Sequence, residues 1–189
     1  MLNIVLFGAP GSGKGTQSKI LLKNYQLEYI STGNILREQI AQQTPLGLEA
    51  KSLIDQGQLV PDNLIVKILE QRMSEAIAPK GFLFDGYPRT LAQAEILEQL
   101  LAKMGTSLSY FISLEVPEDE LTKRLLNRAT IEGRSDDTKE VIEQRFKEYE
   151  SKTKPVKDYF AQKGKMIQIS GIGTEAEVSE RLDKILQNK

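Results

Sequence analysis

The fold of this chain is decided near its N-terminus by Gly8-Ala9-Pro10-Gly11-Ser12-Gly13-Lys14-Gly15-Thr16, which follows the apolar run Ile4-Val5-Leu6-Phe7. Glycines at this spacing free backbone N–H groups to surround phosphate oxygens, and a lysine at this position reaches the β- and γ-phosphates of a nucleotide. A helix that starts after Lys14 points the positive end of its dipole at the same anion. The stretch therefore predicts a phosphate-binding loop between a strand and a helix.

One position departs from the general pattern of such loops. Gly15 stands where a Ser or Thr would bind Mg²⁺, and the hydroxyl comes one residue later, at Thr16. We therefore expect Mg²⁺ to be held mainly by phosphates and water, with Thr16 and an acidic residue nearby and no direct protein ligand. The alternative is a glycine-rich turn without a ligand, but four glycines and a lysine at these offsets argue against it.

Composition limits the chemistry that the chain can perform. Its 189 residues, 40% of them hydrophobic, suit one domain with a real core. The net charge of −1 offers no broad basic surface for nucleic acid or an anionic membrane. The absence of Cys and His excludes disulfides, thiol nucleophiles, imidazole bases and Cys/His zinc sites. No segment approaches the ~18 apolar residues of a membrane span, so we expect a cytoplasmic protein, and a monomer because no exposed apolar stripe stands out.

Short apolar runs alternate with longer helical patterns, which is typical of βαβ units. We expect an α/β fold with a P-loop NTPase core, in which a five-stranded parallel sheet carries helices on both faces. The expected strands are Asn3–Phe7, Glu28–Ile30, Gly81–Phe84, Leu108–Glu115 and Lys165–Ile169. Helix starts are indicated by Pro117 with three following acids, by the pair Thr174 and Glu177, and by the pair Asp137 and Glu140.

Two regions do not fit this alternation. Residues 31–60 contain successive helical patterns without a strand, broken at Thr44-Pro45, and residues 127–137 are a short polar segment that includes Gly133. We expect both regions to be inserts on the ligand-binding edge of one domain that spans residues 1–189.

Asp85 and Arg89 are candidate site residues beside the third expected strand. Asp85 ends a buried run, where a carboxylate would lie near the magnesium of a bound nucleotide, although it could instead make a turn with Gly86. Arg89 follows within four residues and would present its guanidinium at the same edge.

The arginines as a set point to phosphate. The chain has eight arginines against seventeen lysines, and six arginines fall in the regions just described or on the neighbouring helices: Arg37, Arg89, Arg124, Arg128, Arg134 and Arg145. Arginine suits planar, bidentate recognition of phosphate. The alternative for Arg124 and Arg128 is charge stabilisation of a helix C-terminus, and the alternative for Arg145 is an ion pair with a glutamate three or four residues away.

Several blocks of the chain together resemble the nucleoside monophosphate kinases, and among them the adenylate kinases most closely. The blocks are Gly8–Thr16, Ser31–Arg37, Gly57–Asp62, Asp85–Thr90 and the arginines at 124, 128, 134 and 145. The resemblance implies reversible phosphoryl transfer from Mg-ATP to AMP, giving two ADP, without a covalent intermediate. It also implies that residues 31–60 form the NMP-binding insert and that residues 127–137 form a short lid.

The resemblance also assigns candidate roles. It places the ATP phosphates near Gly11, Ser12, Gly13, Lys14, Gly15 and Thr16, and the donor adenine near Gly173. It places AMP near Thr32, Arg37, Gln58, Leu59, Val60, Gly86, Tyr87, Pro88, Arg89 and Gln93. It implies a catalytic set of Lys14, Asp85, Arg89, Arg124, Arg128, Arg134 and Arg145, with Arg128 also on ATP, Arg134 and Arg145 also on AMP, and Asp136 and Asp137 accompanying the lid arginines.

Two residues depart from the family pattern. Asn34 replaces the usual aspartate, and we expect it to cap the following helix instead, while Tyr87 replaces a more usual Phe. Gln93 is assigned to the adenine of AMP, although Thr90 and Gln93 could instead form a capping box.

Three other functions fit the residues less well. A UMP/CMP kinase shares this core and lid, but Thr32 and Gln93 favour AMP. A nucleotide-gated switch would need a base-reading Asn-Lys-x-Asp motif, which the chain lacks, and a sugar or shikimate kinase would have no use for the two acceptor blocks at residues 57–62 and 86–89.

Overall fold

The expected parallel sheet is confirmed by the computed structural model, which describes residues 1–76 and 80–187. Its strands are β1 (Ile4–Phe7), β2 (Glu28–Ser31), β3 (Phe82–Asp85), β4 (Tyr110–Glu115) and β5 (Met166–Ser170). They lie in the order β2-β3-β1-β4-β5 and all pair in parallel. The expected boundaries differ by at most two residues, and Asp85 proves to be the last residue of β3.

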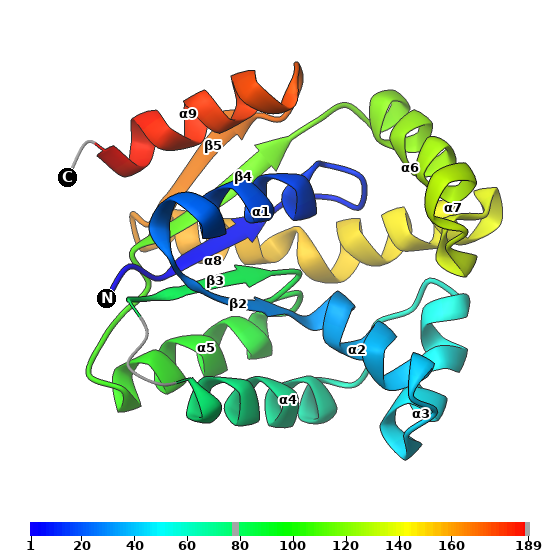
Figure 1. Cartoon of the computed structure of the whole chain (residues 1–189), viewed down its shortest axis with the longest axis horizontal. Helices are drawn as coiled ribbons and strands as arrows, with labels where there is room; N and C mark the ends of the chain where they lie inside the picture. The colour runs from blue at the N-terminus through cyan, green and yellow to red at the C-terminus, as the bar shows by residue number, and fades with distance from the viewer. Residues whose placement is uncertain (77–79, 188–189) are drawn as a thin grey trace.

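Helices cover both faces of this sheet (Figure 1). They are α1 (Lys14–Tyr25), α2 (Thr32–Ala41), α3 (Pro45–Asp55), α4 (Asp62–Glu75), α5 (Leu91–Lys103), α6 (Glu118–Glu132), α7 (Lys139–Glu148), α8 (Pro155–Gln162) and α9 (Glu175–Gln187), with a 3₁₀ turn η1 (Ser135–Asp137) and a π-turn η2 (Tyr149–Thr153). Among the described residues, no helix combines the length and apolar character needed to cross a membrane.

Alternate side chains of β1 enter two separate cores. Ile4 and Leu6 pack with residues of α1 and α9, whereas Val5 and Phe7 pack with residues of α4, α5 and α8. All four residues are almost fully buried. Burial on both faces explains why this strand is a continuous apolar run rather than an alternating one.

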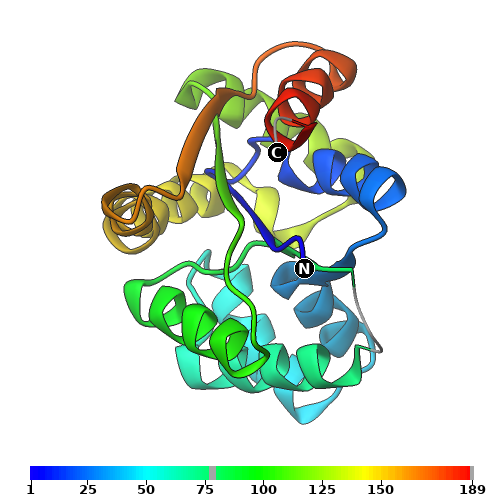
Figure 2. The ribbon, with the colours of Figure 1, turned by 90° about the vertical axis from the view of Figure 1, so that its left-hand side faces the viewer.

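The helices of the two expected inserts lie on the same side of the molecule, beyond the carboxyl ends of the strands (Figure 1). The pair α2 and α3 follows β2, and the group α6, η1 and α7 follows β4. The chain termini lie on the opposite side, which faces the viewer in Figure 2. The edge of the sheet where parallel α/β folds bind ligands therefore lies between the two groups of helices.

One of the predicted helix caps is confirmed and another is wrong. Thr174 and Glu177 form the expected reciprocal capping box at the start of α9. At α7, however, Thr138 is the cap, since its hydroxyl accepts from the N–H of Val141, and Asp137 is not the capping residue. The carboxylate of Asp137 instead pairs with arginines.

Candidate active site

A single cleft of about 900 Å³ opens at the carboxyl edge of the sheet between the two groups of helices. Every residue named above as a candidate catalytic, ATP-side or AMP-side residue lines this cleft. The lining comes from segments far apart in the chain: the loop before α1, α2, the segment before α4, the segment after β3, α6, η1, α7 and the segment before α9.

The loop before α1 leaves a helix N-terminus open to an anion. Gly13 is the N-cap of α1 with a φ of 95°, a left-handed conformation that glycine adopts without strain. No side chain in the described chain caps this helix, so the N–H groups of its first turn remain available to a ligand.

Lys14 is held inside this loop. Its Nζ donates to the carbonyl oxygens of Gly8, at 2.8 Å, and Ala9, at 3.0 Å. Burial lowers the pKa of Lys14 to about 8, although the charge on Asp85 opposes the shift. A buried ammonium with only neutral oxygen acceptors is suited to meet an anion that enters the cleft.

Tyr29 orients the carboxylate of Asp85. Its hydroxyl donates to Asp85 Oδ2 at 2.8 Å, and burial together with the charge on Asp85 raises the pKa of Tyr29 to about 12. A side chain added at Gly15 would bring its Cβ within 3.8 Å of the same oxygen, so the carboxylate lies beside the start of α1. We did not predict Tyr29, because its contact depends on β2 lying beside β3.

The acidic groups near the cleft do not form a metal cage. Among the described residues, no three Asp, Glu, His or Cys side chains gather closely enough to hold a cation. Asp85 and Thr16 are the kinds of oxygen ligand that Mg²⁺ accepts alongside phosphate and water, and both line the cleft. The donor set therefore fits a metal that arrives with the nucleotide phosphates.

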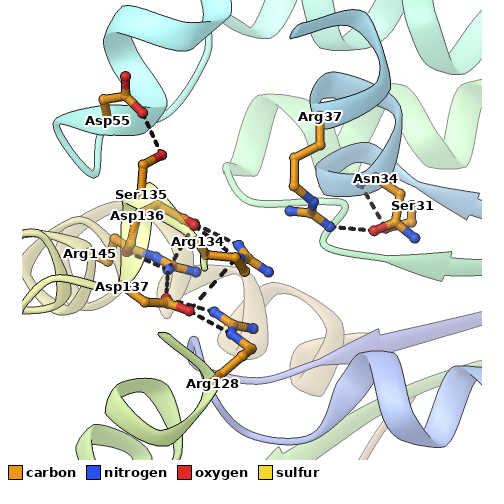
Figure 3. Close-up of polar contacts among 10 residues, drawn as sticks. All are labelled: Ser31, Asn34, Arg37, Asp55, Arg128, Arg134, Ser135, Asp136, Asp137 and Arg145. Atoms are coloured by element: carbon orange, nitrogen blue, oxygen red, sulfur yellow. Dashed lines mark hydrogen bonds and ion pairs between the residues drawn. The ribbon is translucent and has the colours of Figure 1, made fainter. Parts of the chain in front are cut away.

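Three arginines and two aspartates form a buried charge cluster around η1 (Figure 3). Arg128 donates to both carboxylate oxygens of Asp137, at 2.7 and 2.8 Å, and Arg134 donates to both of Asp136, at 2.8 and 2.6 Å. Arg145 lies between them and donates to Asp137 Oδ1 at 2.8 Å and to the carbonyl of Asp136 at 3.0 Å. The alternative ion pair of Arg145 with a glutamate of its own helix is therefore not what the structure adopts.

The charges of the cluster shift the pKa values of its members. The Asp137 side chain has no exposed surface. Burial alone would raise the pKa of Asp136, but the Arg134 hydrogen bond and the charges on Arg145 and Arg128 lower it to about 2. Burial lowers the pKa of Arg145 to about 10. Three guanidinium groups face two carboxylates, which leaves positive charge for a phosphate group to neutralise.

Arg124 forms an ion pair with Glu120 Oε1, one turn earlier on α6, at 2.8 Å. It also donates to the carbonyl of Gly171 at 3.1 Å, so it ties α6 to the segment before α9.

On the other side of the cleft, Arg37 and Arg89 approach the loop after β3. Arg89 Nε donates to the carbonyl of Gly86 at 2.7 Å. Arg37 donates to Asn34 Oδ1 (Figure 3). The expected capping role of Asn34 is wrong, because Ser31 caps α2 by accepting from the N–H of Asn34. The amide of Asn34 instead holds the arginine without neutralising its charge.

Gln93 is more constrained than the sequence suggests. Thr90 caps α5 by accepting from the N–H of Gln93, but the Gln93 side chain does not close a capping box. Its Oε1 accepts from the N–H of Arg89 at 2.7 Å, and its Nε2 donates to Asp62 Oδ1 at 2.7 Å. Asp62 was not among the predicted site residues, because 30 intervening residues hide this contact from any local pattern.

A hydrogen bond joins the two groups of helices across the cleft. Ser135 Oγ of η1 donates to Asp55 Oδ1 of α3 at 2.8 Å (Figure 3). The 3₁₀ turn that carries Asp136 and Asp137 is thereby joined to the end of α3.

Comparisons with known proteins agree with this geometry. A family model described as Adenylate kinase matches residues 6–165. The chain is 47% identical over 188 residues to an adenylate kinase of Parabacteroides distasonis, covering 100% of this chain and 99% of that protein. It is 48% identical to an adenylate kinase of Bacteroides thetaiotaomicron, covering 98% and 100%, and 44% identical to one of Xylella fastidiosa, covering 96% and 97%. With its phosphate loop, arginine cluster and full-length similarity, this chain belongs to the adenylate kinase family.

Proposed function

We propose that the chain catalyses reversible phosphoryl transfer from Mg-ATP to AMP, giving two ADP, in the cleft at the carboxyl edge of the sheet. One observation carries the proposal: the phosphate loop and a second set of arginines line the same cleft of about 900 Å³. A cleft with two phosphate-binding sides suits two nucleotides placed phosphate to phosphate.

The proposed donor side consists of the loop residues 11–16 with Arg124, Arg128 and the segment at Gly173. Lys14 and the first turn of α1 would bind the ATP phosphates, and Mg²⁺ would arrive as part of the Mg-ATP substrate beside Thr16 and Asp85. When bound with ATP, the metal would supply positive charge that neutralises the negative charge developing during transfer.

The proposed acceptor side consists of residues of the expected NMP-binding insert and of the segment after β3. Arg37 and Arg89 would bind the phosphate of AMP, while Thr32, residues 58–60 and Gln93 would surround its nucleoside. Arg37 suits this role because Asn34, which accepts its hydrogen bond, is neutral and leaves the guanidinium charge for phosphate.

The proposed mechanism is positioning and charge stabilisation. The phosphate of AMP is already ionised near neutral pH, so no side chain has to remove a proton from the attacking oxygen. Arg128, Arg134 and Arg145 would turn from Asp136 and Asp137 toward the transferred group, where spread negative charge needs bidentate donors. Closure of the lid at residues 127–137 would exclude water that could otherwise hydrolyse ATP.

An acceptor panel tests this function. Purified protein is given Mg-ATP with AMP, UMP, CMP, GMP or buffer alone, and ADP formation is followed. We expect AMP to be the preferred acceptor and buffer alone to give almost no ADP. Faster phosphorylation of UMP or CMP would assign the protein to pyrimidine nucleotides, and ADP formation without any acceptor would show a hydrolase. Lys14→Met serves as the inactive control.

A further inference from the structure

Gln93 has both ends of its side-chain amide fixed by the protein. Its side chain is buried, with 2% of the residue exposed, and its Oε1 and Nε2 bind the Arg89 N–H and Asp62 Oδ1, each at 2.7 Å. A carboxylate only accepts hydrogen bonds and a backbone N–H only donates them. The two partners therefore allow one orientation of the amide and exclude the flipped one.

Asp62 is itself held in place by a second contact. Its Oδ2 accepts from the hydroxyl of Thr90 at 2.8 Å, and Thr90 is the cap of α5, the helix that carries Gln93. Asp62 is the first residue of α4, so the bond joins the starts of two helices. Asp62 is not among the described residues that line the cleft, whereas Gln93 is. Asp62 therefore touches no ligand in the cleft directly, and Gln93 is the cleft-lining residue that its carboxylate holds.

The fixed orientation matters because the amide keeps unused capacity. Nε2 has a second hydrogen and Oε1 has a second lone pair, which can face a purine. A 6-aminopurine donates from N6 and accepts at N1, whereas a 6-oxopurine accepts at O6 and donates from N1. An amide that cannot flip matches one of these patterns and opposes the other.

We propose that Asp62 is a positioning residue that fixes the Gln93 amide and so makes the acceptor site select a 6-aminopurine nucleotide over a 6-oxopurine nucleotide. The inference rests on the proposed function, in which Gln93 faces the base of AMP. Removal of the carboxylate frees one end of the amide, so the site then discriminates less between a 6-aminopurine and a 6-oxopurine.

The test compares AMP with IMP as acceptors for Mg-ATP. Asp62→Asn is nearly isosteric, and its amide can donate to Oε1 or accept from Nε2, so position 62 no longer excludes the flipped amide, and the Arg89 N–H alone then opposes it. We expect it to raise the ratio of kcat/KM for IMP to that for AMP by about tenfold, the scale of one hydrogen bond left unmade in a buried site. The KM for ATP should stay within about twofold of the unmodified value. Asp62→Ala is the second variant and should move the ratio in the same direction.

Two controls separate positioning from simple destabilisation. Glu118→Gln makes the same kind of change at the first residue of α6, which also follows a Pro cap, and it should leave the ratio unchanged. In a Gln93→Leu background, Asp62→Asn should have no further effect on the ratio, because the residue acts through Gln93.

A ratio unchanged in both Asp62 variants, or an equal loss of kcat/KM for both acceptors, overturns the inference while AMP kinase activity stands. IMP turnover below detection in every variant counts as an unchanged ratio. Failure of the unmodified protein to phosphorylate AMP overturns the proposed function and the inference with it.

Discussion

Lys14 should make this protein more stable as the pH rises, whereas a lysine stabilised by an ion pair makes a protein less stable as the pH rises. Burial lowers its pKa to about 8 in the folded protein, against 10.5 as the ordinary value. Between these two values the unfolded chain binds more protons than the folded chain, so the free energy of unfolding rises with pH. Below about pH 8 the charged Lys14 is buried at a cost, which the charge on Asp85 offsets in part and which a bound anion would offset further.

The magnitude follows from the size of the shift. The fall from 10.5 to about 8 corresponds to roughly 3 kcal/mol at 1.36 kcal/mol per pKa unit. Lys14 lines an open cleft and keeps some contact with solvent, so we expect about 2 kcal/mol to be measured. Replacement of Lys14 by Met removes the titrating group, and the advantage of the unmodified protein over the variant should grow by this amount between about pH 7 and about pH 10.5.

Urea unfolding of both proteins across this range gives the difference between their free energies of unfolding. Other groups that titrate at alkaline pH contribute equally to both proteins and cancel in this difference. Lys23→Met, on the exposed surface of α1, is the control and should give a difference that stays flat. The same Lys14→Met protein should lose most of its turnover without loss of fold at neutral pH. A pH-independent difference for Lys14→Met, or unfolding of that variant at pH 7, would refute the view that Lys14 is a buried charge held for phosphate.

Three further predictions concern the rest of the cleft. Arg134→Ala should reduce kcat by more than about 100-fold while changing ATP affinity only a few-fold, since Arg134 is proposed to contact the transferred group in the closed transition state. A loss of ATP affinity as large as the loss of kcat, in a direct binding assay, would make Arg134 a ground-state ligand instead. Tyr29→Phe removes the hydroxyl that holds Asp85, so the Mg²⁺ concentration for half-maximal activity should rise about fivefold, whereas Tyr25→Phe, which loses a bond to Asp183, should leave it unchanged. The carboxylate of Asp136 has a pKa of about 2 against 3.8 as the ordinary value, so its stabilising effect is present above about pH 4 and is lost as the pH falls to about 2. The unfolding free energies of the unmodified protein and of Asp136→Asn should therefore converge in acid. A difference between them that stays constant with pH would contradict the assignment.

The parallel sheet and the phosphate loop could be predicted from the sequence because both depend on short-range patterns. The strands are continuous apolar runs because they are buried on both faces, and the loop needs glycines and a lysine at fixed offsets. The wrong cap predicted for α7 also comes from a short-range pattern, since Asp137 and Thr138 are both residue types that cap helices. Thr138 is the cap because Arg128 of α6 and Arg145 of α7 bind the carboxylate of Asp137.

Local residue patterns predicted the class of fold, the edge of the sheet where we place the ligand and the residues that line it. Tertiary packing set the pairs that hold the site together, several of whose members lie outside the cleft lining: Tyr29 with Asp85, Asp62 with Gln93, and Ser135 with Asp55. Each of these pairs joins segments at least 31 residues apart. A hydrogen bond of this kind depends on atoms placed within about 3 Å of each other by helix and strand packing, and such packing leaves no local repeat in the chain.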